Sequence, residues 1–93
     1  MSMFRGKSLI GISKDIAEGY VTVNPIFLKP LNIEDLEALY HQIGKLQGSV
    51  RGEKFPHGNI RGIRERNIRL QRLHSALIII RAFASDRGMK HLF

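Results

Sequence analysis

Two long stretches of the chain place apolar residues every three or four positions, the spacing of an amphipathic helix. The first stretch has its apolar positions at Ile33, Leu36, Leu39 or Tyr40, Ile43 and Leu46. Asn32 is a favourable N-cap residue, and Glu34 and Asp35 complement the positive end of the helix dipole. Because glycine commonly follows the last helical residue, Gly48 is the expected end. The pattern therefore predicts a helix over 32–48.

The second stretch begins at Ile60, and its apolar positions are Ile63, Leu70, Leu73, Leu77 and Ile80. Asn59 is suited to cap it and Gly88 to end it. This pattern predicts a long helix over 60–87, joined to the first helix by a glycine-rich loop over 49–59. The isoleucine-rich segment 77–80 also suits a buried strand, but its helix-forming flanks favour the helix.

The first thirty residues have a different pattern. The segments 8–13 and 20–24 are short and rich in β-branched and aromatic residues, and a polar connection that ends at Gly19 separates them. This arrangement is typical of a β-hairpin, although residues 13–18 also suit a helical turn. Proline lacks a backbone donor, so the proline-flanked segment 26–28 is at most an edge strand or an extended lead-in to the first helix.

These elements together predict an α+β fold. A short N-terminal β-hairpin, with extended structure through residues 1–30, precedes an antiparallel hairpin of two helices, of which the C-terminal one is longer. The 93 residues are too few to fill two cores, so the chain is expected to form one domain over 1–93.

All of the formal net charge of +7 lies in the second half of the chain. Residues 1–50 carry five Lys or Arg against five acids, whereas residues 51–93 carry ten against three. The densest basic cluster lies in the long helix and consists of Arg61, Arg64, Arg66, Arg69 and Arg72, with Asn67 and Gln71 among them. Helical spacing spreads these Arg side chains over one broad face.

That Arg face suits a polyanion, because a guanidinium donates two parallel hydrogen bonds to a phosphate and several of them together release counterions. The Asn67 and Gln71 amides are suited to base edges. The cluster therefore predicts a nucleic-acid-binding module. An acidic protein surface is an equally suitable partner for the same face.

The far end of the long helix predicts a different interaction. From Ala76 to Ala84 the sequence is apolar nearly all round, apart from Arg81, whose long stem is expected to reach the surface. A helix of this kind needs cover on every side. The N-terminal strands can cover one side, and a second copy of the chain is the simplest cover for the rest. The predicted interface consists of Leu70, Leu73, Leu77, Ile80 and Phe83. The alternative function is thus that of a scaffold or adaptor protein, expected to be a homodimer.

No pattern of residues indicates an enzyme, a metal or a cofactor. The histidines stand sixteen or seventeen positions apart, at His41, His57, His74 and His91, so no pair has helical ligand spacing. The chain has no Cys, no nucleophile elbow and no phosphate loop. We therefore expect a protein that is not an enzyme and has no small-molecule substrate.

The sequence also gives expectations for membranes and location. The longest apolar run is five residues, far short of the roughly 20 that a membrane span needs. A membrane-surface helix is disfavoured because the Arg cluster and the apolar cluster follow one another along the helix rather than facing opposite sides. The absence of Cys and of a secretory signal favours the cytoplasm.

Overall fold

Helices make up the fold in the computed structural model, which describes residues 3–4 and 7–88. In chain order the helices are α1 (Leu9–Glu18), α2 (Pro25–Leu28), α3 (Ile33–Arg51) and α4 (Ile60–Asp86). The strands β1 (Met3–Phe4) and β2 (Lys7–Ser8) pair over two residues each, antiparallel. This short ladder is the whole of the sheet within the described residues.

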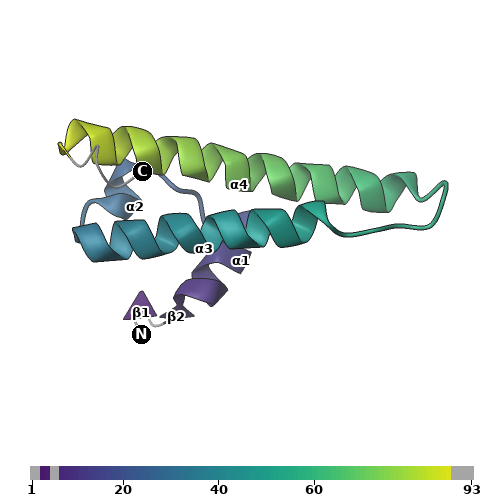
Figure 1. Ribbon diagram of the computed structural model, residues 1–93, viewed down its shortest axis with the longest axis horizontal. Helices are drawn as coiled ribbons and strands as arrows, with labels where there is room; N and C mark the ends of the chain where they lie inside the picture. The colour runs from purple at the N-terminus through teal and green to yellow at the C-terminus, as the bar shows by residue number, and fades with distance from the viewer. Residues whose placement is uncertain (1–2, 5–6, 89–93) are drawn as a thin grey trace.

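The two long helices set the shape of the molecule (Figure 1). Helices α3 and α4 lie side by side and antiparallel, and the loop 52–59 joins them at one end. Helix α1 packs against both of them, and α2 packs against α4 near the end that is remote from the loop. The described chain is elongated, with extents of 46 × 26 × 20 Å.

Each helix begins at a side chain that accepts a hydrogen bond from a backbone N–H of the first turn. These N-cap residues are Ser8, Asn24, Asn32 and Asn59. The Asn32 Oδ1 atom lies 2.8 Å from the backbone nitrogen of Asp35, and the Asn59 Oδ1 atom lies 2.9 Å from that of Gly62. A capped first turn satisfies backbone donors that have no partner within the helix.

Helix α3 runs past the predicted end at Gly48. It continues to Arg51 and is followed by Gly52, whose N–H bonds back to the Gly48 carbonyl. Glycine lowers helix propensity but does not stop a helix that packing holds in place. In the last turn Val50 is only 4 % exposed, and its burial offsets the cost of the glycine.

The predicted α+β fold with an N-terminal β-hairpin is wrong, because the first expected strand, 8–13, begins helix α1, and the second, 20–24, is irregular chain between α1 and α2. The Ser8 hydroxyl caps α1, and the apolar residues Ile12 and Ile16 fall on one face of it and are buried. Pro25 begins α2 behind the cap Asn24, so the segment 26–28 is helical and is neither an edge strand nor an extended lead-in. Residues 1–2 and 5–6 of the expected extended segment lie outside the described residues.

The core lies between α3 and α4 at the end of the hairpin that α1 and α2 cover. Its most fully buried apolar residues are Leu28, Leu36, Ile43, Leu73 and Ile80, each with 0 % exposure. All buried residues of α4 lie between Leu73 and Ala84, so the first half of this helix contributes none. The loop end of the hairpin therefore stands clear of the core.

Candidate nucleic-acid interface

The loop end of the helical hairpin carries most of the charge of the protein. We call residues 51–69 the basic arm; they comprise the last residue of α3, the loop and the first ten residues of α4. Its charged residues are the cations Arg51, Lys54, Arg61, Arg64, Arg66 and Arg69 and the acids Glu53 and Glu65. Six cations against two acids leave a formal net charge of +4 on the arm, out of +7 for the chain.

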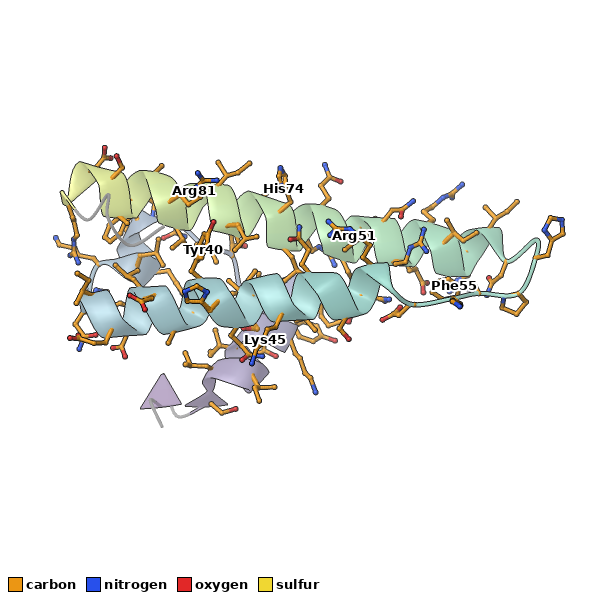
Figure 2. The ribbon with its side chains drawn as sticks, viewed as in Figure 1. Tyr40, Lys45, Arg51, Phe55, His74 and Arg81 are labelled. Atoms are coloured by element: carbon orange, nitrogen blue, oxygen red, sulfur yellow. The ribbon has the colours of Figure 1, made fainter. Side chains whose placement is uncertain are left out.

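The loop of the basic arm folds back onto α4. In Figure 2, Phe55 lies between the loop and that helix. A Cβ atom added at Gly62 would stand 2.7 Å from Cδ1 of the Phe55 ring, so the two residues are in close contact. The Arg66 guanidinium lies 5.8 Å from the centroid of the same ring. Phe55 thus anchors the loop, and a glycine on α4 makes room for it.

Glu53 holds two of the arginines of the arm. Its Oε1 atom lies 2.6 Å from Nη2 of Arg69, and its backbone carbonyl accepts a hydrogen bond from Nη1 of Arg66 at 3.3 Å. The other terminal nitrogen of Arg66 donates to Oδ1 of Asn67 at 3.4 Å. The Nε atom of Arg66 is buried and has no partner within the described residues. The donors of Arg66 therefore form only long hydrogen bonds or none within the described residues.

The remaining cations of the arm face solvent. The Arg61 side chain is 91 % exposed and forms an ion pair of 3.3 Å with Glu65, one helical turn away. Arg51, Lys54 and Arg64 are exposed as well, and no acid of the described chain pairs with them. These three side chains are available to an incoming anion without the loss of an existing partner.

Arg72 and Gln71 lie outside the arm, although the sequence grouped them with it. Nη1 of Arg72 donates to the backbone carbonyl of Ala17 at 3.1 Å, and its guanidinium lies against Gly19 at the end of α1. Gln71 lines a groove between α4 and the segment after α1. Of the seven predicted residues, the structure brings five together on the arm: Arg61, Arg64, Arg66, Asn67 and Arg69.

The predicted set of nucleic-acid-binding residues did not include Arg51 and Lys54. Arg51 and Lys54 add to the charge of the arm, and Glu53 offsets part of it. The basic residues on either side of the loop were visible in the sequence. They lie beside the Arg residues of α4 because the loop folds back onto that helix. The helical spacing of α4 alone does not predict this contact.

The residues predicted as a dimer interface belong to the core of the chain itself. Leu73 and Ile80 are fully buried, and Leu70, Leu77 and Phe83 pack against the same core. Arg81 is exposed, and Figure 2 shows it and His74 projecting from α4 on the side away from α3. Among the residues whose burial is described, other large apolar side chains are the most exposed: Tyr20, Ile26, Ile60 and Ile78.

The described residues show no sign of a metal centre or of a membrane span. No three His or acidic side chains among them gather as ligands, and none of their helices has the length and apolar character to cross a bilayer. No family model, curated protein or solved structure matches the chain. The function of the basic arm has to be inferred from its own chemistry.

Proposed function

We propose that the protein binds nucleic acid through the basic arm, mainly by contact with the phosphate backbone. The observation that carries this proposal is the formal net charge of +4 on an end of the hairpin that contributes little to the core. Solvent-exposed guanidinium and ammonium groups are suited to bind phosphates, and neutralising several phosphates releases counterions. The expected location of such a protein is the cytoplasm.

The shape of the arm supports the same proposal. Beyond the core the hairpin narrows to the start of α4 and the returning loop (Figure 1). The N-terminus of α4 lies in the arm, and its partial positive charge adds to that of the Arg residues. Exposed Asn67 is the one amide of the predicted set that stays on the arm.

Contacts of this kind are expected to be strongly salt-dependent and weakly sequence-specific, since phosphates position a protein without reporting the sequence. The test is fluorescence anisotropy with labelled DNA and RNA oligomers at about 50 and 200 mM salt. About four phosphate contacts would weaken binding on the order of a hundredfold between these concentrations. Failure of the wild-type protein to bind either nucleic acid at low salt would refute the proposal.

A matched pair of variants localises the site. Arg51→Gln with Arg64→Gln removes two exposed charges from the arm, and Lys45→Gln with Arg81→Gln removes two exposed charges outside it. We expect the first double variant to bind at least tenfold more weakly than the second, with a salt dependence reduced by about two phosphate contacts. Equal losses of affinity in the two double variants would mean that the overall positive charge of the protein, and not the basic arm, binds the nucleic acid. Tighter binding to polyglutamate than to nucleic acid would point to an acidic protein surface.

A second candidate function, self-association as a scaffold or adaptor, is favoured by a different surface. Ile78 is 52 % exposed on α4, beside a groove of about 500 Å³. The groove is lined mostly by apolar residues, among them Val23, Pro25, Ile79 and Phe83. Exposed apolar area of this kind is often covered by a partner, and here the proposed partner is a second copy of the chain.

Sedimentation equilibrium at high micromolar concentration tests this second function. We expect a dimer in the wild type and in Ser49→Asp, and a monomer in Ile78→Asp. Ser49 is exposed on α3 and does not line the groove, so its variant controls for the added charge. A wild-type monomer throughout the concentration range would refute self-association and leave the nucleic-acid proposal untouched.

A further inference from the structure

We infer that the Glu53 carboxylate occupies, in the free protein, the place that a backbone phosphate takes when nucleic acid binds. This inference rests on the proposed function of the basic arm and concerns how the same site is controlled. The Glu53 carboxylate would then be a built-in competitor, which nucleic acid displaces from Arg69.

The contacts of Glu53 have the chemistry of an anion site. A carboxylate and a phosphodiester both present two anionic oxygens to a guanidinium, so one replaces the other with little change in hydrogen-bond geometry. The Arg69 side chain is only 21 % exposed, and its Nη2 atom lies 2.6 Å from Oε1 of Glu53. Arg69 is thus the least exposed of the cations paired on the arm, and an acid of the same arm already holds it.

Arg66 is the second part of this site. It reaches the backbone carbonyl of Glu53 at 3.3 Å rather than the carboxylate, and its Nε donor is buried without a partner within the described residues. Because the Nε atom is buried, the donors that Arg66 can offer to a phosphate are those of its two terminal nitrogens. An anion that enters beside Arg69 can accept hydrogen bonds from the terminal nitrogens of Arg66, whose present bonds are long, at 3.3 and 3.4 Å. The free protein therefore holds a site that its own carboxylate fills only in part.

Release of Glu53 requires little rearrangement. The residue follows the helix cap Gly52 and stands in the irregular part of the loop, and its side chain is 41 % exposed. A partly exposed ion pair contributes little to stability, so a second anion can replace the Glu53 carboxylate. Because Arg51 and Arg64 attract the same polyanion, a nucleic acid displaces Glu53 more effectively than a small monovalent anion does.

The experiment compares Glu53→Gln with Glu65→Gln. Each variant removes one acid from the arm and raises the net charge by one, so the long-range attraction for an oligomer changes equally. Glu65 pairs with Arg61, which is almost fully exposed, so freeing Arg61 creates no new site. In the anisotropy assay at about 100 mM salt we expect Glu53→Gln to bind about fivefold more tightly than Glu65→Gln.

Two further variants test the contact itself. In an Arg69→Gln background the advantage of Glu53→Gln over Glu65→Gln should disappear, because the contested guanidinium is gone. Glu53→Asp keeps the net charge and shortens the reach toward Arg69, so it should still bind more tightly than the wild type. Thermal unfolding followed by circular dichroism checks that each variant folds.

The outcomes separate the inference from the function on which it rests. If Glu53→Gln binds no more tightly than Glu65→Gln while the wild type binds nucleic acid, Glu53 only fastens the loop and the inference is wrong. If the advantage survives in the Arg69→Gln background, the competition does not run through Arg69 and the inference is also wrong. Absence of binding by the wild type overturns the proposed function, and the inference with it.

Discussion

Nη1 of Arg72 donates a hydrogen bond to the backbone carbonyl of Ala17, 3.1 Å away and 55 positions earlier in the chain. The last carbonyls of a helix have no intrahelical partner, and the C-terminal end of its dipole attracts cations. Helix α1 ends at Glu18 and is followed by Gly19 at a φ of +84°. Arg72 donates to a carbonyl near this end and places a positive charge beside the negative end of the helix dipole. A residue predicted to bind phosphate thus ties α1 to α4.

Replacement of Arg72 by Ala should therefore lower stability more than it lowers affinity for nucleic acid. We expect a loss of about 1 kcal/mol in the free energy of unfolding, since a charged donor is removed from a partly exposed hydrogen bond. Urea unfolding measures this loss. Arg61→Ala removes a charge that is 91 % exposed on the same helix and should change the urea midpoint little. Equal midpoints for the two variants would contradict the structural role of Arg72.

Glycine positions within the helices should respond in opposite ways to alanine. Gly44→Ala should raise the free energy of unfolding by about 0.5–1 kcal/mol, because nothing lies within 4 Å of the added Cβ and alanine favours the helix. Gly62→Ala should lower it, because its methyl group would stand 2.7 Å from the Phe55 ring and 2.8 Å from Nδ2 of Asn59.

Thermal unfolding distinguishes the two glycine variants. A change of 1 kcal/mol shifts the melting temperature of a domain of this size by about 4–8 °C. If Gly62→Ala melts as high as Gly44→Ala, the close packing of Phe55 on α4 is not maintained in solution.

Loss of the Asn59 cap should act locally. Asn59→Ala removes an acceptor for the Gly62 N–H and is expected to cost about 1 kcal/mol. Because no residue of α4 before Leu73 is buried, the first turns depend on this cap more than on packing. Hydrogen exchange of the amides over 61–64 should accelerate, while those near Ile80 keep their protection. Uniform acceleration along α4 would show that the helix opens only as one unit.

The two sides of α4 near its C-terminal end should differ sharply in their tolerance of truncation. Ile80 is fully buried, and Ile80→Ala is expected to cost about 2–5 kcal/mol. Ile78 is 52 % exposed, and Ile78→Ala should change the free energy of unfolding by about 0.5 kcal/mol or less. Urea unfolding at a concentration that keeps the protein monomeric compares the two. Similar losses would mean that Ile78 also packs within the chain.

The long helices were predictable because the signals that form them are local. Apolar spacing and an asparagine cap predicted a helix over 32–48 and another over 60–87, and the structure has them at Ile33–Arg51 and Ile60–Asp86. The later end of α3 was not predictable from Gly48 alone. It depends on Val50, whose burial against the rest of the chain holds the last turn in place.

The N-terminal segment was misjudged because its composition and its periodicity disagree. Ile10, Ile12 and Val21 are β-branched residues that suggest strands. Ile12 and Ile16, however, are spaced one helical turn apart. Ser8 is also placed to cap a helix, and its hydroxyl accepts a hydrogen bond from the N–H of Gly11. Tertiary packing decides such cases, since a ten-residue helix is marginal by itself. Helix α1 is stabilised by burying Ile12 and Ile16 against the core.

By itself the sequence determined that this is a small basic chain with two long amphipathic helices, and it located most of the charge near the loop that joins them. Only the tertiary structure decided which arginines are engaged, because helical spacing defines a face but not what lies against it. Arg72 reaches Ala17, Arg69 reaches Glu53, and Arg64 is left in solvent. Segments distant along the chain set those partners, and local sequence does not encode them.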